Sequence, residues 1–303
     1  INSLYDAIKE NNPKKIIDIV NNYKIDLNNV FYVPQDVSFD GGGGYGTVAN
    51  ISPLIYAIEC QNIEAIDTLL KLGANVGQLT DIYTGYDEED FIILDDYTNR
   101  ISITPLMYAA YSSTEEVISF LIKKGAKVNV KDRKGRTALM YGPSEALIRA
   151  GANVNAKDNE GKTALMYWQN EALISAGANV NAKDNNGWTA LMYACDGIGV
   201  ESVIKNPDII KSLIRAGANI NEVNNYGDTA LMWAILTYRS AVSDDYYSGR
   251  ELNDYTLPTF ETIRFLIYNG ANVNIRNKKG ETPLSLAKEL PQLTKLLKDN
   301  GAY

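Results

Sequence analysis

Apolar residues return along this chain in two alternating kinds of block. A short block such as Leu191-Met192-Tyr193-Ala194 follows a threonine, and a later stretch such as Val117–Ile122 places its apolar residues at helical spacing. A glycine closes the later stretch, which is typical of a helix C-terminus. The pattern therefore predicts pairs of short helices, with one pair in each repeat.

Two short motifs locate these repeats. Thr, followed by Ala or Pro and then Leu, opens the first helix, and Gly-Ala follows the second. The first motif falls at Thr104, Thr137, Thr163, Thr189, Thr229 and Thr282, with Ser52 as a variant. The second falls at Gly73, Gly125, Gly151, Gly177, Gly217, Gly270 and Gly301. Thr is a favourable N-cap and Pro suits the first helical position, so the motifs predict where helices begin.

The segment between the two motifs has a constant length. Gly-Ala and the next Thr are 12 positions apart in five successive repeats, as from Gly151 to Thr163. A short run, Val154–Lys157, precedes Asp158, and Gly161 follows three residues later. Asp that bonds its own following backbone, with Gly at a positive φ, is typical of a type I turn. We expect a rigid β-turn finger that leads into each first helix.

A repeat of about 33 residues built from a turn and two helices, with a Thr-Pro-Leu type of motif, resembles the ankyrin repeat. The resemblance covers nearly the whole chain, and the Thr-Ala-Leu-Met-Tyr-Ala form is similar to bacterial-type repeats. It implies an all-α solenoid of about seven to eight units. It also implies that residues 1–303 form a single solenoid, with an N-terminal cap and long loop at 1–50 and a C-terminal cap repeat at 282–303. The repeats between them cover 52–281 and are interrupted by insertions at 76–103, 196–206 and 239–257.

Two stripes of side chains depart from the family pattern. Methionine replaces the usual His at Met107, Met140, Met166, Met192 and Met232. An unbranched thioether fills gaps between packed repeats, so we expect these residues in the core; a methionine-lined ligand groove is the alternative. The next position holds Tyr56, Tyr108, Tyr141, Tyr167, Tyr193 or Trp233. This stripe predicts an internal aromatic ladder whose hydroxyls reach water at its edge.

Two repeats, 137–162 and 163–188, are 26 residues long rather than about 33. Seven residues correspond to about two helical turns, so each of their helices should be shorter by about one turn. Gly142 and Trp168 occupy equivalent positions where the family has Ala. We expect Trp168 to fill the space left by the missing turns, with Gly142 beside it.

The absence of histidine excludes several kinds of chemistry. Without His the chain has no Ser-His-Asp or Cys-His arrangement and no imidazole metal site. Cys60 and Cys195 lie four repeats apart, too far for a disulfide, and are expected to be buried thiols. The glycine run at 41–46 lacks the Gly-Lys-Ser/Thr that closes a phosphate loop. We expect no catalytic residue, no metal and no cofactor.

The charge of the chain bears on its partners and its location. A net charge of −8 disfavours nucleic acid as the main partner, and no apolar run is long enough to span a membrane. Residues 76–103 contain seven Asp and Glu against Arg100 alone, as a solvated loop commonly does. The chain begins with Ile1 rather than Met. A cytoplasmic location and export after removal of an N-terminal signal therefore both stay open.

These features favour a monomeric, non-enzymatic scaffold that binds a partner protein. The resemblance implies contacts through the finger tips and the concave face of the first helices. The candidate contact residues are Arg133, Lys134, Arg136, Lys162, Asn186, Trp188, Tyr226 and Asp228. Exposed aromatic residues are typical interface anchors, which favours Trp188 and Tyr226; a Trp188 that merely covers the neighbouring finger is the alternative.

Two other functions remain in view. An inhibitor or immunity protein for a basic toxin would suit the acidic charge. An enzyme would need an unrecognised carboxylate site in the insertion 76–103 or 239–257. A separate hypothesis concerns the acidic stretch 81–96, which precedes a finger that carries Lys131, Arg133, Lys134 and Arg136. Attraction over about 10 Å would fold the stretch back over that finger, although each exposed ion pair contributes little.

Overall fold

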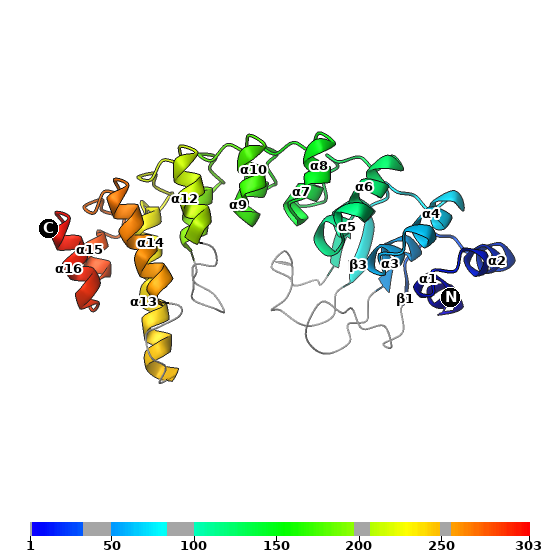
Figure 1. Ribbon diagram of the computed structural model, residues 1–303, viewed down its shortest axis with the longest axis horizontal. Coiled ribbons are helices and arrows are strands. Elements are labelled where there is room, and N and C mark those ends of the chain that lie inside the picture. Colours follow the sequence, from blue (N-terminus) through cyan, green and yellow to red (C-terminus); the bar gives the residue numbers. More distant parts are fainter. Residues whose placement is uncertain (1, 33–49, 84–99, 197–206, 249–255) are drawn as a thin grey trace. The chain divides into compact units, whose positions relative to one another are not determined.

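The computed structural model describes residues 2–32, 50–83, 100–196, 207–248 and 256–303. These residues form sixteen α-helices and four short strands (Figure 1). The helices follow one another in pairs, so the predicted all-α repeat architecture of about seven to eight units is confirmed. The chain divides into two compact units, an N-terminal unit, Ile1–Asn153, and a C-terminal unit, Val154–Tyr303.

The described part of the N-terminal unit contains four helix pairs. These are α1 (Asn2–Lys9) with α2 (Pro13–Tyr23), α3 (Pro53–Glu59) with α4 (Ile63–Lys71), α5 (Pro105–Ser112) with α6 (Glu115–Lys123), and α7 (Ala138–Tyr141) with α8 (Glu145–Arg149). The first helices of successive pairs pack against one another, as α3 does on α1 and α5 does on α3. Leu54, Ile66 and Leu106, each at most 2% exposed, form part of the core between the helices.

Two hairpins interrupt this unit. β1 (Phe31–Tyr32) pairs antiparallel with β2 (Asn50–Ile51), and β3 (Thr80–Tyr83) pairs antiparallel with β4 (Arg100–Ile103). Each hairpin ends next to the N-cap of a first helix, so the chain enters and leaves the insertion on the finger side of the repeat. The glycine run 41–46 and the acidic residues 87–96 lie outside the described residues.

Four pairs also form in the C-terminal unit over the residues that the structure describes. These are α9 (Ala164–Trp168) with α10 (Glu171–Ser175), α11 (Ala190–Cys195) with α12 (Pro207–Arg215), α13 (Ala230–Ser248) with α14 (Thr256–Tyr268), and α15 (Pro283–Leu286) with α16 (Pro291–Asp299). The first helices α9, α11, α13 and α15 pack in sequence, and α12 packs on both α10 and α14. Figure 1 shows α13 and α14 as the longest helices of this unit, lying side by side.

The insertion 239–257 mainly lengthens these two helices. We expected it between paired helices, but α13 continues to Ser248 and α14 begins at Thr256. Tyr238 is 8% exposed and packs on Phe260 of α14, with ring centroids 5.5 Å apart. This contact holds α14 against α13 just outside the insertion.

The repeated Thr and Met act together at the start of the first helices. Thr104 Oγ1 accepts a hydrogen bond from the backbone N–H of Met107 at 3.2 Å, as predicted for an N-cap. In return, the backbone N–H of Thr104 points at Met107 Sδ, 3.4 Å away, and Thr163 and Met166 repeat this contact at 3.5 Å. All five methionines are at most 3% exposed, so their predicted place in the core is confirmed.

The two short repeats have the predicted short helices. α5 has 8 residues and α6 has 9, whereas α7 has 4 and α8, α9 and α10 have 5 each. A loss of about four residues per helix is about one turn. Glu115 of α6 supports α8: its carboxylate accepts hydrogen bonds from the Ser144 hydroxyl and from the N–H groups of Glu145 and Ala146 at 2.9–3.1 Å. These bonds satisfy first-turn N–H groups of α8 in addition to the one that the Ser144 side chain accepts from Leu147.

The predicted roles of Gly142 and Trp168 were wrong in part. Trp168 is 36% exposed at the end of α9, so its ring does not fill an internal space. A side chain at Gly142 would overlap the carbonyl group of Ala110 at the end of α5. The glycine is therefore required by the close approach of α5, a contact that the sequence comparison with Trp168 did not anticipate.

Candidate partner-binding surface

Five fingers share one turn geometry. They comprise residues 132–136, 158–162, 184–188, 224–228 and 277–281. In the finger 158–162 the N–H of Asp158 donates to the carbonyl of Lys162 at 3.0 Å, and the N–H of Gly161 donates to the carbonyl of Asp158 at 3.1 Å. Gly161 has a φ of 80°, a value that favours glycine. The predicted β-turn is confirmed.

An asparagine in the segment before each finger fixes the spacing of the repeats. Asn155 Nδ2 donates to the carbonyl of Gly177 at 3.2 Å, and Asn155 Oδ1 accepts from the N–H of Asn179 at 2.7 Å. The same pair of bonds occurs at Asn28, Asn129, Asn181, Asn221 and Asn274. The recurring Val-Asn of the sequence is the signal from which this ladder could have been predicted.

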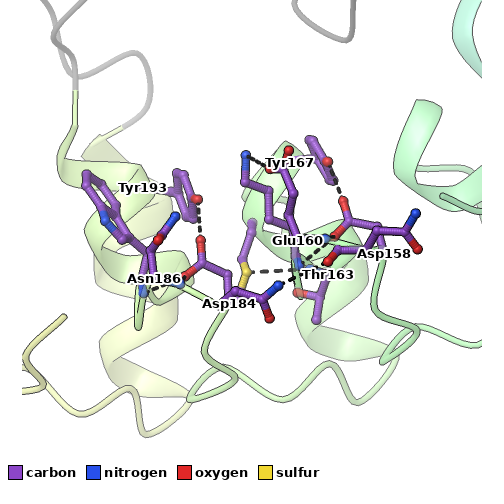
Figure 2. A network of polar contacts seen from close by, with 12 residues as sticks. Asp158, Glu160, Thr163, Tyr167, Asp184, Asn186 and Tyr193 are labelled. Carbon is purple, nitrogen blue, oxygen red and sulfur yellow. Dashed lines mark hydrogen bonds and ion pairs between the residues drawn. The ribbon is translucent and has the colours of Figure 1, made fainter. Parts of the chain in front are cut away.

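A carboxylate locks each of three fingers to its first helix. Asp184 Oδ1 accepts from the N–H groups of Asn186 and Trp188, both at 2.8 Å, and Asp184 Oδ2 accepts from the hydroxyl of Tyr193 at 2.7 Å (Figure 2). Asp158 and Tyr167 repeat this pairing at 2.6 Å, and Asp132 and Tyr141 repeat it at 2.7 Å. These tyrosine hydroxyls bind carboxylates, whereas we expected them to reach water. Burial, followed by the bond to Asp184, raises the pKa of Tyr193.

In the C-terminal unit the tips of adjacent fingers are joined directly. The N–H of Asn185 donates to the carbonyl of Glu160, and the N–H of Asn225 donates to that of Asn186, each at 2.9 Å. The N–H of Lys278 donates to the carbonyl of Tyr226, also at 2.9 Å. Four successive fingers therefore form one hydrogen-bonded ribbon, which holds the side chains of their tips at fixed spacing.

The finger 132–136 offers less surface than predicted. Arg136 is 4% exposed, with Nε 2.8 Å from Asp132 Oδ2 and Nη2 2.7 Å from the hydroxyl of Tyr141. The long side chain turns inward because a buried carboxylate lies within its reach, so Arg136 is withdrawn from the candidate contacts. Arg133 stays exposed, and its guanidinium lies 3.4 Å from Asp81. Lys134 is half-buried.

This Arg133–Asp81 ion pair bears on the fold-back hypothesis. Asp81 lies on β3, at the start of the acidic stretch 81–96, and its carboxylate also accepts from the hydroxyl of Ser102 on β4. One acidic residue of the stretch therefore does contact the basic finger. Residues 84–96 lie outside the described residues, so the hypothesis stays a prediction for them.

The candidates of the C-terminal unit lie along the joined ribbon. Lys162 Nζ lies 2.9 Å from Glu160 and 5.7 Å from the ring centroids of both Tyr167 and Tyr193. Asn186 is exposed at its tip, and Tyr226 is 57% exposed.

Trp188 and Asp228 complete this set. Trp188 is half-buried, with its ring centroid 5.0 Å from that of Tyr193 and 4.5 Å from that of Trp233, so part of the ring covers the neighbouring repeat. Asp228 is half-buried and accepts from Asn277 Nδ2 at 2.7 Å.

Within the described ranges, no cluster of three or more His, Cys, Asp or Glu side chains could hold a metal ion, and no helix has the length and apolar character to cross a membrane. Cys60 is half-buried, and burial raises the pKa of its thiol; Cys195 is fully buried, with a raised pKa for the same reason. Both cysteines are free.

Comparisons with known proteins identify the repeat. A family model for three copies of the ankyrin repeat matches residues 89–142, 144–205 and 170–243, and a single ankyrin repeat model matches 226–278. Two fowlpox virus proteins named as ankyrin repeat proteins, FPV115 and FPV216, are 30% identical over 115 residues and 31% identical over 80. These matches cover 32% and 26% of this chain but only 20% and 21% of the two relatives.

Solved structures agree with the family models. The crystal structure of an ankyrin repeat domain from Acinetobacter baumannii AYE is 29% identical, with a TM-score of 0.51, and the match covers 66% of this chain and 98% of that domain. The ankyrin repeat domain of Bcl-3, a member of the IκB family, has a TM-score of 0.54 at 24% identity, over 82% of this chain and 98% of that domain, and shares the fold. With family models over more than half of its length, this chain belongs to the ankyrin repeat family.

Proposed function

We propose that this chain is a non-enzymatic scaffold that binds a partner protein through its finger tips and the adjacent first helices. Ankyrin repeats generally mediate protein–protein interaction, and their fold is typically a non-enzymatic interaction module. The observation that carries the proposal is the hydrogen-bonded ribbon of fingers in the C-terminal unit. A surface that is ordered before binding loses less conformational entropy on association, so its contacts contribute more to affinity.

The ribbon carries side chains suited to an interface. Tyr226 is 57% exposed on a tip that is bonded to both neighbouring tips. Trp188 lies one finger away and keeps part of its ring at the surface. Large aromatic side chains at fixed positions are common binding hot spots. Lys162, Asn186 and Asp228 supply polar groups around them, as in the rim of a typical interface.

The N-terminal unit would contribute charge rather than aromatic surface. Arg133 is largely exposed, and its ion pair with Asp81 is of the exposed kind that contributes little to stability. Such a pair is readily exchanged for a carboxylate on a partner. Arg133 and Lys134 are therefore proposed to affect the association rate and its salt dependence more than the final affinity.

Alanine variants at the two aromatic residues test the proposal. A partner would first be captured from the source organism with the unaltered chain and identified by mass spectrometry. Its affinity for Tyr226→Ala should then fall about 30-fold or more, which corresponds to about 2 kcal/mol. Trp188→Ala should weaken binding as well. Tyr268→Ala is the matched control, because Tyr268 is 65% exposed on the second helix α14, away from the fingers.

A preserved affinity in Tyr226→Ala and Trp188→Ala would contradict the proposal. So would an equal loss in Tyr268→Ala, because it would place the interface on the second helices. Circular dichroism of each variant establishes that the repeats remain folded.

The net charge favours a narrower version of the same function. A chain of net charge −8 attracts a basic protein, so an inhibitor of a basic toxin is the second candidate. Association with such a partner should slow strongly as salt is raised, since exposed charges are screened over about 10 Å at moderate salt. A rate that is independent of salt would argue against this version. The enzyme alternative gains no support from Asp81, which is engaged by Ser102 and Arg133.

A further inference from the structure

The finger 224–228 replaces the locking pair of the preceding fingers. Asn224 stands where three earlier fingers have Asp, and Trp233 stands where their first helices have Tyr. The turn itself is unchanged: the N–H of Asn224 donates to the carbonyl of Asp228 at 3.0 Å, and the N–H of Gly227 donates to the carbonyl of Asn224 at 2.9 Å. The two replacements therefore alter the chemistry of the pair while the backbone stays the same.

The backbone contacts determine which way the Asn224 amide points. Asn224 Oδ1 accepts from the N–H groups of Tyr226 at 2.9 Å and Asp228 at 3.0 Å, as Asp184 Oδ1 does in the finger before it. With its oxygen held by two donors, Asn224 must place Nδ2 where Asp184 places Oδ2. That position faces the aromatic residue nine places along the chain, which here is Trp233.

Both side chains that face each other across this pair therefore present hydrogen-bond donors, whereas the pairs of the earlier fingers join an acceptor to a donor. Asn224 is 4% exposed, and both Asn224 Nδ2 and Trp233 Nε1 are buried without a hydrogen-bond partner among the residues that the structure describes. Amide and indole N–H groups only donate, so neither can satisfy the other. A buried donor without an acceptor destabilises the fold, and places where a protein breaks a local rule that its other repeats keep are expected to be functional.

We propose that Asn224 and Trp233 form a binding site for a neutral hydrogen-bond acceptor, an amide carbonyl supplied by the partner protein. A carbonyl oxygen has two lone pairs and no proton, so it complements both N–H groups. Asp228 lies on this finger and Asp184 on the finger before it, and their carboxylates would repel a carboxylate ligand. A neutral carbonyl therefore fits better than an acidic group.

Access to the site involves Trp188. Both donor atoms are buried, so a carbonyl can reach them only when a side chain moves. Trp188 packs on Trp233 with ring centroids 4.5 Å apart and is only partly buried, so its ring is the one that shifts. The assignment of the carbonyl to a partner protein rests on the function proposed above, whereas the preference of the two donors for a carbonyl can be measured without any partner.

The site is tested first with a small amide. The three tryptophan indole N–H signals of the ¹⁵N-labelled full chain would be followed by NMR, assigned by single Trp→Phe variants, and titrated with N-methylacetamide. The Trp233 signal and the side-chain amide signal of Asn224 should shift and reach saturation. Trp168, which is 36% exposed, is the internal control, and the chemical shift of its indole signal should change linearly with amide concentration without saturating. If the Trp233 signal shifts only linearly, as the Trp168 signal does, the proposed site is wrong. If acetate saturates the two signals at lower concentration than the amide does, the preference for a neutral acceptor is wrong.

A restoring variant tests the connection to function. Asn224→Asp combined with Trp233→Tyr rebuilds the pair seen at Asp184 and Tyr193, and should raise Tm by about 2–4 °C. It should also abolish saturation by N-methylacetamide and weaken partner binding about tenfold or more. An unchanged or lower Tm contradicts the presence of unpaired donors.

The failures of the two proposals differ. If the restoring variant keeps full affinity while Tyr226→Ala loses it, the interface stands and the carbonyl site is wrong. If the Asn224 and Trp233 signals saturate while Tyr226→Ala and Trp188→Ala both bind the partner normally, the site stands and the proposed interface is wrong.

Discussion

Two fingers with the same backbone use the residue before the capping threonine in opposite ways. In the finger 132–136 this residue is Arg136, whose side chain is buried against Asp132. In the finger 184–188 it is Trp188, whose ring lies across two aromatic neighbours and remains half-exposed. The repeat determines the position of the backbone, and the side chain then decides whether a finger closes on itself or offers surface to a partner.

The difference has a consequence for stability. Asp132 neutralises a buried cation and accepts a bond from Tyr141, whereas the groups that donate to Asp184 are the Tyr193 hydroxyl and backbone N–H groups, all neutral. The aspartate at this position therefore stabilises a buried cation in one finger and only neutral groups in the other. A buried charge that loses its partner is far costlier than a neutral group that does.

The largest expected effect is on Asp132. Asp132→Ala removes the carboxylate that lies 2.8 Å from Arg136 Nε while the guanidinium stays buried, and should lower the free energy of unfolding by about 3–5 kcal/mol. Asp184→Ala, the matched control, leaves only neutral groups without a partner and should cost about 1–3 kcal/mol. Urea unfolding of the two variants measures both values. Equal losses would show that the inward arginine does not distinguish the two fingers.

Trp188 should come next in size. Trp188→Ala removes ring contacts to Tyr193 and Trp233, but the ring is only half-buried, so the cost should stay near 1–3 kcal/mol, below that of a fully buried aromatic residue. Urea unfolding would be read together with partner binding. A loss of stability without any loss of binding would assign the ring to the fold alone.

Trp168 should matter less than Trp188. Its ring is 36% exposed at the end of a five-residue helix, so Trp168→Ala should cost about 1 kcal/mol or less. The same unfolding experiment measures it. A cost of about 3–5 kcal/mol would restore the earlier expectation that Trp168 fills the space left by the shortened helices.

The smallest effect belongs to the exposed pair of Arg133 with Asp81. Arg133→Ala should change the free energy of unfolding by about 0–1 kcal/mol, with less effect at high salt. Lys134→Ala is a neighbouring control that removes the same charge. If Arg133→Ala also exposes β3 to proteolysis while Lys134→Ala does not, the ion pair holds the hairpin on the finger. Equal protease sensitivity would show that it does not.

Much of the fold could be predicted because it depends on short-range patterns. The Thr and Gly motifs located the helix starts and ends, and the constant interval after Gly151 predicted the finger turn. The shortened helices followed from length alone. These features are set by residues a few positions apart in the sequence, and the same physical reasons apply in every repeat.

The parts that could not be predicted depend on contacts between repeats. The need for glycine at 142 comes from Ala110, and the two lengthened helices α13 and α14 pack against each other. The inward turn of Arg136 depends on finding Asp132 and Tyr141 together at the base of its finger. At the candidate surface, the tips were located correctly in sequence, but whether each side chain points outward depends on such neighbours.

Hydrogen exchange with and without the captured partner tests the central claim most directly. The account predicts that binding slows exchange in the fingers 158–162, 184–188 and 224–228, with little change in the second helices α12 and α14. Slower exchange confined to α12 and α14, with unchanged fingers, would contradict it.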